Sequence, residues 1–499
     1  MFKKVLVANR GEIAKRIFAA CRELGVQTVA IYSDADADAP WVKVADYAFP
    51  LGGVTATESY LDQEKIFKIA AEANVEAIHP GYGFLSENAA FAANCAAHGI
   101  KFIGPSPDAM RIMGSKASAR EVAQQAGVPV TPGVDGAGKS DVELAQAAND
   151  LGYPVLIKAS AGGGGKGMRI VHSPDAFPEA LQAARAEARN SFGDDHMLLE
   201  RFFTQIHHIE IQILGDEFGH VLHLYERECS IQRRHQKIIE ESPSPTIPDE
   251  VRERIANAAV SLAQSVGYSS AGTVEFMYTD SGEFYLLEMN TRLQVEHPIT
   301  ELVTGVDLAK WQIRIAAGER LTLKQEQIKQ RGHAIECRIY AEDPALNFLP
   351  SIGEIVHCKW PSGPRVRVDD GVTTGSIVSP YYDPMLAKLI TWGYDRQEAV
   401  ARMLDALKET IILGVTSNIP YLIDILQEAD FQQGQTTTSY LAQHFPTWSA
   451  QTDADELVWL AIGAFEALQG RNEPAKTPIE HSTTTIDPWN TVKTWRNVS

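Results

Sequence analysis

Short apolar runs alternate with amphipathic stretches over residues 1–114. The runs 4–8 and 28–32 are rich in β-branched residues, and between them apolar side chains recur at helical spacing from Ile13 to Leu24, just before Gly25. The apolar pairs 77–78 and 102–103 continue the pattern. Strands that alternate with helices of this length are typical of a doubly wound parallel sheet. The loop 79–84, which follows a predicted strand, is therefore a candidate wall of a ligand site.

The hydrophobic pattern changes twice after this α/β domain. Residues 115–332 begin with a helix, continue with a strand–loop–strand unit around a glycine run, and are rich in hairpins from residue 204. Residues 333–446 form an α+β pattern, and 447–499 hold one amphipathic helix (455–468) and a polar tail. A chain of 499 residues exceeds one compact core. We predict three domains, 1–114, 115–332 and 333–446, followed by the helix and tail.

Residues 133–140 (GVDGAGKS) match the phosphate-binding P-loop pattern letter for letter. A P-loop requires a buried strand immediately before it, whereas Pro129 and Pro132 precede this segment, and a central strand cannot accommodate them. Ser140 followed by Glu143 is instead typical of a helix capping box. We interpret the match as coincidental and predict a surface loop that begins a helix.

A second glycine motif lies at 162–167 (GGGGKG). Its flanks, 154–158 and 168–172, both resemble strands, whereas a dinucleotide fingerprint requires a helix after the glycines. The pattern predicts a glycine-rich hairpin whose backbone amides approach nucleotide phosphates, with Lys158 and Lys166 supplying positive charge. The alternative is a flexible hairpin without function.

Two glutamates, Glu275 and Glu288, flank the turn 280–282. A regular hairpin centred between Ser281 and Gly282 places them directly opposite each other, and the apolar residues 284–287 indicate burial on both faces. Two buried, facing carboxylates call for a cation, and oxygen ligands favour Mg²⁺ or Mn²⁺. A solvated surface hairpin is the alternative, because the register is inferred.

Polar residues then alternate with apolar ones along the continuing strand, and the polar face carries Glu288, Asn290, Arg292, Gln294 and Glu296. On this face Asn290 can complete the metal site. Arg292 suits a planar oxyanion such as bicarbonate, because its donor fork matches carboxylate geometry. Glu296 is placed as a general base. Two nearby stretches, 208–213 and the basic cluster 232–237, look toward the same cleft, although each alone is typical of a solvated face.

Charge, cysteine content and hydropathy narrow the class of protein. The net charge of −19 disfavours a nucleic-acid partner, which requires a basic face. Five scattered cysteines predict reduced thiols and a cytoplasmic location. No apolar run approaches the ~18 residues that span a bilayer, so we expect no membrane association. The N-terminus reads as a first strand rather than a signal peptide.

Several of these segments together resemble the biotin carboxylase family. The segments are 7–14 (VANRGEIA), 79–83 (HPGYG), 158–168, 232–237 (QRRHQK) and 288–298 (EMNTRLQVEHP), and the resemblance runs colinearly over residues 1–446. It implies an ATP-grasp fold with a mobile lid at about 132–203. It also implies an enzyme, an ATP-dependent ligase, that carboxylates biotin with MgATP and bicarbonate through carboxyphosphate.

The resemblance also implies roles for individual residues. Glu275, Glu288 and Asn290 would hold the metal, and Arg292, Gln294, the Val295 backbone and Glu296 would bind bicarbonate, with Glu296 as the base. Lys237 would contact the γ-phosphate, and Arg338 with Tyr82 would stabilise the biotin enolate. The nucleotide site would comprise Lys116, Lys158, Gly163, Gly164, Gly165, Lys166, Glu200, Arg201, Phe203, His208, Gln232, His235, Glu275 and Glu288.

The implied partners are a biotin carboxyl carrier protein, a carboxyltransferase subunit and a second copy of this chain in a homodimer. No Met-Lys-Met biotin acceptor is present in the sequence, so biotin would arrive on the carrier. Residues 447–499 resemble the lead-in to the next domain of an acetyl-CoA or propionyl-CoA type carboxylase. Two alternatives remain: another ATP-grasp ligase that joins a carboxylate to an amine, and a catalytically silent ATP-binding subunit.

Overall fold

A five-stranded parallel sheet forms the N-terminal part, in the order β3-β2-β1-β4-β5. The computed structural model describes residues 1–159, 168–234, 236–450, 460 and 463–464. Val5, Leu6 and Val7 of the central strand are fully buried, as a sheet covered on both faces requires. The elements are β1 Lys4–Val7, α1 Gly11–Glu23, β2 Gln27–Tyr32, β3 Tyr47–Pro50, α2 Gln63–Glu72, β4 Ala77–His79, α3 Ala89–Ala97 and β5 Lys101–Phe102. The predicted doubly wound parallel sheet is confirmed.

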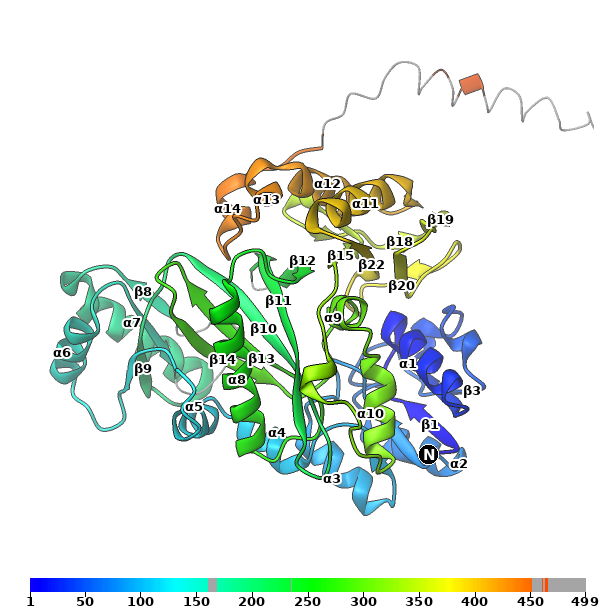
Figure 1. Ribbon diagram of the computed structural model, residues 1–499, viewed down its shortest axis with the longest axis horizontal. Helices are drawn as coiled ribbons and strands as arrows, with labels where there is room; N and C mark the ends of the chain where they lie inside the picture. Colours follow the sequence, from blue (N-terminus) through cyan, green and yellow to red (C-terminus); the bar gives the residue numbers. More distant parts are fainter. Residues whose placement is uncertain (160–167, 235, 451–459, 461–462, 465–499) are drawn as a thin grey trace, which may run out of the picture. The chain divides into compact units, whose positions relative to one another are not determined.

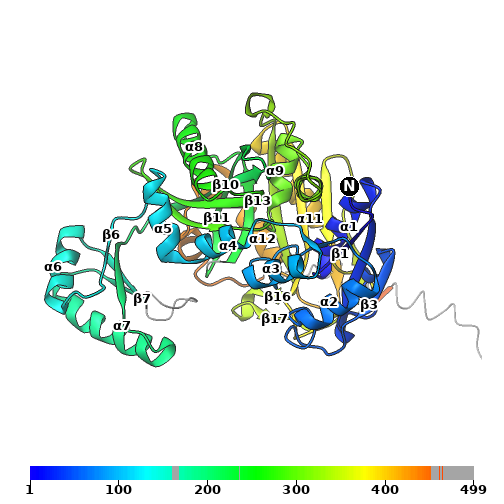
Figure 2. The ribbon, with the colours of Figure 1, turned by 90° about the horizontal axis from the view of Figure 1, so that it is seen from below.

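A small four-stranded antiparallel sheet, in the order β6-β9-β7-β8, carries the glycine-rich segment. Strands β7 and β8 pair from Val155↔Val171 to Ile157↔Arg169, which confirms the predicted strands on either side of the glycines. Helices α6 and α7 pack on this sheet (Figure 2). The elements are α4 Pro107–Gly114, α5 Lys116–Gln125, β6 Gly133–Asp135, α6 Asp141–Leu151, β7 Val155–Ala159, β8 Arg169–Val171, α7 Phe177–Phe192 and β9 Met197–Arg201.

The P-loop match at 133–140 has no phosphate-binding geometry. Its first three residues form β6, which pairs antiparallel with β9. Ser140 then caps α6 in a full capping box with Glu143. The predicted capped helix is confirmed, whereas the predicted surface loop over 133–140 is wrong for residues 133–135, which form a paired strand.

An eight-stranded antiparallel sheet forms the rest of the framework, in the order β14-β13-β10-β11-β12-β15-β22-β20 (Figure 1). Helix α8 packs on β10 and β11, and α11 on β22 and β15. The sheet continues across residue 332, because β12 pairs with β15 from Ile239↔Cys337 to Ser242↔Ala334. Its strands are β10 Ile206–Gly215, β11 Val221–Arg233, β12 Gln236–Ser242, β13 Ser270–Thr279, β14 Phe284–Asn290, β15 His333–Tyr340, β20 Val366–Asp370 and β22 Met385–Gly393.

Helices and short hairpins complete the fold around this sheet. The helices are α8 Asp249–Ser265, α9 His297–Thr304, α10 Leu308–Ala316, α11 Arg396–Glu409, α12 Ile419–Gln427, α13 Ala429–Gln432 and α14 Tyr440–His444. The short strands are β16 Glu342–Asp343, β17 Leu349–Pro350, β18 Gly353–Glu354, β19 His357–Lys359, β21 Ile377–Val378 and β23 Ile411–Leu413. Most of the predicted helix 455–468 and all of the polar tail beyond it lie outside the described residues.

Strand β10 shows how the sequence pattern divides the sheet into a core face and a site face. Ile209, Ile211 and Ile213 are fully buried in the core beneath α8, as their alternation predicts. The polar residues between them, Glu210 and Gln212, are fully buried as well, on the opposite face. A buried polar face is costly unless its groups are paired, so this face marks the site.

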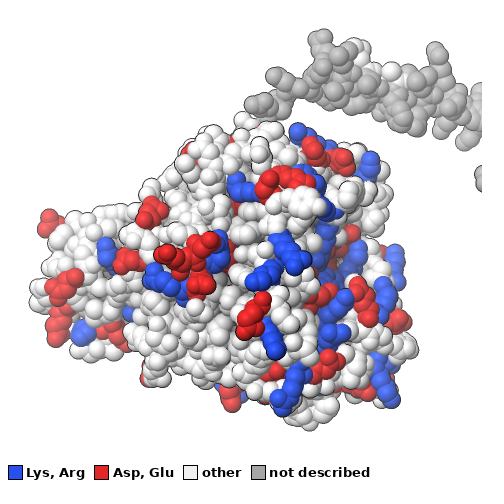
Figure 3. Space-filling view, in the orientation of Figure 1, with Lys and Arg blue, Asp and Glu red and all other residues white. Residues whose placement is uncertain are grey.

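On the face drawn in Figure 3, acidic and basic side chains are interspersed. In the part of the chain that the structure describes, no helix combines the length and apolar character needed to cross a membrane.

Gly215 allows a close backbone approach at the end of β10. A Cβ atom there would lie 2.3 Å from the carbonyl oxygen of Tyr268. We predict that Gly215→Ala lowers the free energy of unfolding by about 1–3 kcal/mol, because the backbone must shift. Urea unfolding measures this. Gly114→Ala is the control, since nothing lies within 4 Å of its Cβ. Equal midpoints for the two variants would contradict the prediction.

Candidate functional site

The β13–β14 hairpin places Glu275 directly opposite Glu288, as predicted. The hairpin is not regular, however. Near the turn Phe276 pairs with Leu286, and a β-bulge between this pair and Glu275 restores the predicted register. The opposition of the two glutamates is therefore confirmed, but the regular hairpin from which it was inferred is wrong.

The bulge also makes the burial of the β14 residues near Glu288 differ from the prediction. Glu275 is 6% exposed, whereas Leu287, next to the bulge, is 41% exposed and Glu288 is exposed as well. Burial of residues 284–287 on both faces holds for the first three residues only. The prediction of two buried carboxylates is wrong, because the extra residue turns Leu287 and Glu288 outward together. Glu288 thus faces the open side of the site.

Glu275 is compensated by side chains of this chain. Its carboxylate lies 2.9 Å from Lys237 Nζ and 2.9 Å from His208 Nε2, and it accepts hydrogen bonds from Asn290 and Gln294. Burial by itself raises the pKa of Glu275, but Lys237 and His208 outweigh it and hold that pKa well below its usual range. Glu275 is therefore an ionised carboxylate.

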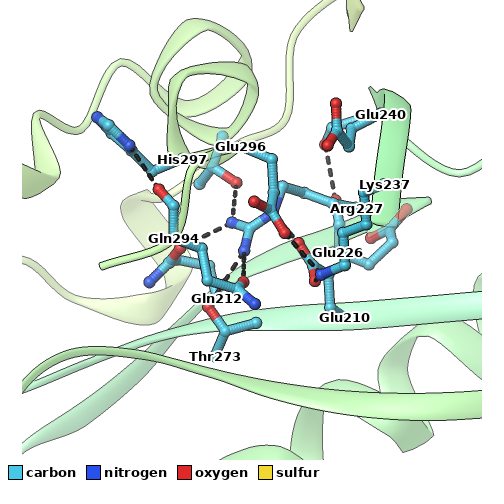
Figure 4. A network of polar contacts seen from close by, with 12 residues as sticks. Glu210, Gln212, Glu226, Arg227, Lys237, Glu240, Thr273, Gln294, Glu296 and His297 are labelled. Carbon is cyan, nitrogen blue, oxygen red and sulfur yellow. Dashed lines mark hydrogen bonds and ion pairs between the residues drawn. The ribbon is translucent and has the colours of Figure 1, made fainter. Parts of the chain in front are cut away.

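Lys237 contacts three carboxylates of the site, and Figure 4 shows it beside Glu210 and Glu296. Its Nζ donates to Glu210 at 2.5 Å, to Glu275 at 2.9 Å and to Glu296 at 2.6 Å. Burial lowers the pKa of Lys237, and the three carboxylates more than reverse this, so that its pKa lies well above the usual value. Glu210 was given no role from the sequence, although the stretch 208–213 that contains it was expected to face the cleft, and it pairs in register with Glu275.

The predicted polar strand ends earlier than expected. Strand β14 stops at Asn290, and residues 291–296 form an irregular segment in which Glu296 is the N-cap of α9. The prediction of a continuous alternating strand is wrong, because the chain turns to begin α9. The side chains of Gln294 and Glu296 still meet in the site, through hydrogen bonds to Glu275 and Lys237.

Glu296 is held between two cations from different strands. One oxygen accepts from Lys237 on β12, and the other accepts from Arg338 NH2 on β15 at 2.9 Å. Burial raises the pKa of Glu296, whereas Lys237 and Arg338 lower it well below the usual value. The predicted base is therefore ionised, and the pairing of β12 with β15 brings Arg338 to it.

The other predicted substrate residues have partners that the sequence did not indicate. Arg292 donates to Glu87 at 2.9 Å and to Asn290 at 2.7 Å. Lys388, which is fully buried, donates to the carbonyl of Val295 at 2.8 Å and contacts Glu12. Tyr82 is half-buried and donates to Glu12.

Some of the predicted nucleotide residues are described by the structure, and the others lie outside the described residues. Lys158 contacts Glu200 at 2.6 Å on paired strands, and Phe203 stacks on Tyr285 with ring centroids 5.3 Å apart. The amide of Arg201 donates to Pro132. Gln232 and His208 are buried on β11 and β10, and Lys116 is the exposed first residue of α5. Gly163, Gly164, Gly165, Lys166 and His235 lie outside the described residues.

The donor set at Glu275 and Glu288 fits a divalent cation. The facing carboxylates supply oxygen ligands. The surrounding protein and the neighbouring charge of Glu275 raise the pKa of Glu288, and a cation between them would relieve that repulsion. Asn290 directs its amide nitrogen to Glu275 and its oxygen to Arg292. Coordination by Asn290 would therefore require its side chain to turn.

Glu240 is the second carboxylate that Arg338 contacts, besides Glu296. It accepts from Arg338 Nε at 2.6 Å and lies opposite Glu336, another fully buried glutamate. Burial raises the pKa of Glu240 to about 7, a shift that Arg338 opposes and the charge of Glu296 increases. Glu240 therefore carries a proton in the folded protein at pH values where it is ionised in the unfolded chain.

This shift predicts a pH-dependent stability. The contribution of Glu240 to the free energy of unfolding is complete below its unfolded pKa and is lost as the pH rises through about 7. Glu240→Gln removes this dependence. Between about pH 5 and pH 8, we expect wild type to lose about 2 kcal/mol relative to the variant. Urea unfolding across this range measures the difference, and a pH-independent difference would contradict the prediction. Exposed Glu326→Gln serves as the control.

Three family profiles match this chain. The profile "Biotin carboxylase, N-terminal domain" matches residues 1–110. The profile "Carbamoyl-phosphate synthase L chain, ATP binding domain" matches 115–324, and "Biotin carboxylase C-terminal domain" matches 336–443.

Characterised relatives and solved structures match over the same part of the chain. A biotin carboxylase of Nostoc sp. is 51% identical over 89% of this chain and 99% of its own length. A pyruvate carboxylase subunit of Methanothermobacter thermautotrophicus is 50% identical, over 89% of this chain and 90% of its own. The biotin carboxylase domain dimer of Hydrogenobacter thermophilus 2-oxoglutarate carboxylase, solved with MgADP, ADP and bicarbonate, has a TM-score of 0.83 at 50% identity. The match covers 89% of this chain and 98% of the Hydrogenobacter chain. The predicted ATP-grasp fold is confirmed.

Proposed function

This chain belongs to the biotin carboxylase family, and from that premise we propose how its site carboxylates biotin with ATP and bicarbonate. The observation that carries the proposal is the position of Glu296. Its carboxylate is ionised and buried. It accepts hydrogen bonds from Lys237 on β12 and from Arg338 on β15, in the C-terminal part of the sheet. A base and two cations that converge on one point suit a reaction between an anion and a phosphate.

The first step joins bicarbonate to the γ-phosphorus of ATP. Arg292, Gln294 and the Val295 backbone would orient bicarbonate, and Glu296 would take its proton as a bicarbonate oxygen attacks phosphorus. ADP leaves and carboxyphosphate forms. Glu275, Glu288 and, once turned, Asn290 would hold Mg²⁺ or Mn²⁺, which supplies positive charge to the phosphates.

Lys237 links ATP binding to the strength of the base. In the described structure it donates to Glu296 and holds the pKa of that carboxylate low. If Lys237 turns to the γ-phosphate, Glu296 loses one of its two cations. The pKa of Glu296 then rises, and the carboxylate becomes a better base when the phosphate is in place.

The second step carboxylates biotin. Carboxyphosphate releases CO₂ and phosphate, and phosphate removes the ureido proton of biotin. Arg338, with Tyr82 nearby, would stabilise the resulting enolate oxygen while the ureido nitrogen attacks CO₂. Lys116, Lys158, Glu200, His208, Gln232, His235 and the glycine hairpin would surround the nucleotide. Closure of the lid, 132–203, would exclude water from carboxyphosphate.

The partners belong to the same proposal. Biotin would arrive on a carrier protein, and a carboxyltransferase would pass the carboxyl group on, with the chain acting as a cytoplasmic homodimer. The relatives named above include enzymes called pyruvate and 2-oxoglutarate carboxylase at about the same identity as the Nostoc biotin carboxylase. An acetyl-CoA or propionyl-CoA acceptor therefore rests on the family resemblance of residues 447–499 alone. The domain limits 1–114, 115–332 and 333–446 are proposals as well.

Omission of one substrate at a time tests the function. We expect ADP release that requires bicarbonate and increases when free biotin is added. The measurement is a coupled assay of ADP with bicarbonate or biotin left out. An amine-dependent rate that is indifferent to biotin would favour another ATP-grasp ligase. Nucleotide binding without ADP release under any bicarbonate condition would favour a silent subunit.

Replacement of Glu296 tests the base. We expect Glu296→Gln to lower kcat for bicarbonate-dependent ADP release by about 10²–10⁴, and to change the KM for ATP by less than about threefold. Steady-state kinetics with each substrate varied measure both constants. Exposed Glu326→Gln should match wild type. A Glu296→Gln variant with wild-type kcat would exclude Glu296 as the base.

A further inference from the structure

We propose that Arg227 is a positioning residue for bicarbonate, which acts by fixing the side chain of Gln294 and by sharing Glu210 with Lys237. This inference rests on the proposed function, because it concerns the same site. Arg227 lies on β11 and its side chain is fully buried. It was not among the residues singled out in the sequence.

Every donor direction of the Arg227 guanidinium is used (Figure 4). Arginine offers five N–H donors in a fixed planar fork. Here Nε donates to Glu210, NH1 to Gln212 and Thr300, and NH2 to Thr273 and Gln294, with distances to the last four of 2.7, 2.9, 3.1 and 2.7 Å. The acceptors come from β10, β13, the segment 291–296 and α9. One buried group therefore joins the sheet to the bicarbonate segment and to the helix behind it.

Arg227 determines which way the amide of Gln294 points. The side-chain oxygen of Gln294 accepts from Arg227 at 2.7 Å, so its nitrogen is directed away from Arg227. That nitrogen donates to Glu275 at 2.7 Å. A flipped amide would place a donor against the donor of Arg227 and an acceptor against the acceptor of Glu275. The proposed bicarbonate residue is thus held in one orientation.

Arg227 also fixes the start of α9, where Glu296 lies. Thr300 is on the first turn of α9 and is fully buried, and its hydroxyl oxygen accepts from Arg227 at 2.9 Å. Glu296 is the N-cap residue of the same helix. A shift of α9 relative to the sheet would therefore move the proposed base, and small misplacements of reacting groups are costly to rate.

The contact with Glu210 reaches Lys237. One oxygen of Glu210 accepts from Arg227 and the other accepts from Lys237. Without Arg227, Glu210 would be a buried carboxylate with Lys237 as its remaining cation and would bind it more strongly. Lys237 would then be less free to turn to the γ-phosphate. Lysine at position 227 cannot substitute, because an ammonium is a point charge without the planar fork.

The test compares the KM values of two variants: Arg227→Lys in the site and Arg252→Lys outside it. Half-buried Arg252 on α8 donates to buried Glu226 at 2.7 Å, so Arg252→Lys reports the general effect of changing an arginine that pairs with a buried glutamate. We expect Arg227→Lys to raise the KM for bicarbonate about tenfold or more, and the KM for ATP by less than about threefold. Arg252→Lys should leave both KM values unchanged. A folded Arg227→Lys variant with the wild-type KM for bicarbonate would overturn the inference.

A double variant distinguishes positioning from a structural role. If Arg227 acts through Gln294, the KM for bicarbonate of Arg227→Lys/Gln294→Ala should equal that of Gln294→Ala within about twofold. Independent, multiplying effects would overturn that route. Wild type is measured first: absence of any bicarbonate-dependent ADP release refutes the proposed function itself, whereas an active wild type with an unaffected Arg227→Lys refutes only this inference.

Thr300 provides a variant that leaves the Arg227–Glu210 pair in place. Thr300→Val removes the acceptor on α9, and we expect it to raise the KM for bicarbonate about threefold to tenfold. Thr300→Ser keeps the hydroxyl and should restore the wild-type value. If Arg227→Lys does not fold, these two variants decide: equal KM values for Thr300→Val and Thr300→Ser would overturn the inference.

Discussion

The ammonium of Lys237 and its three carboxylates form the interaction on which the site depends. Glu210 comes from β10, Glu275 from β13 and Glu296 from the start of α9, and all three contact one nitrogen. Each buried charge would be costly alone, because burial removes it from water. Together they compensate one another, and removal of Lys237 would take from all three carboxylates the one cation that they share. The mutual dependence of these groups explains why the polar face of the sheet can be buried at all.

The continuous eight-stranded sheet extends this arrangement to the proposed biotin residue. Because β12 pairs with β15, Arg338 lies beside the strand that carries Lys237, and both reach Glu296. Arg227 contacts other groups of the site: it donates hydrogen bonds to Glu210, to Gln294 and to Thr300 of α9. The proposed base is thus approached by cations from two directions. Such a preorganised set of charges lowers the reorganisation needed when substrate charges appear.

The sequence predicted the acids more reliably than the path of the chain between them. The opposition of Glu275 and Glu288 is present, yet it arises from an irregular hairpin with a bulge, and the bulge exposes Leu287 and Glu288. A pattern of alternating residues contains no sign of one inserted residue, because bulges depend on both strands. Similarly, the alternation of residues predicted that the strand continues through Glu296. In the structure β14 ends at Asn290, and the position of Glu296 is set by the start of α9.

The sequence pattern by itself determined the parallel sheet, the strands around the glycine run, the capped helix at 141–151 and the opposition of Glu275 and Glu288. These follow from local periodicity, capping and spacing, which act between residues near one another in the chain, whereas the ATP-grasp fold and the roles of most site residues came from the family resemblance. Only the tertiary structure decided that Glu210, Arg227, Lys388 and Glu87 belong to the site, and which partner each side chain has. Those contacts join residues from separate strands and helices, and the charge of each group depends on burial and on neighbours that become close only when the sheet forms.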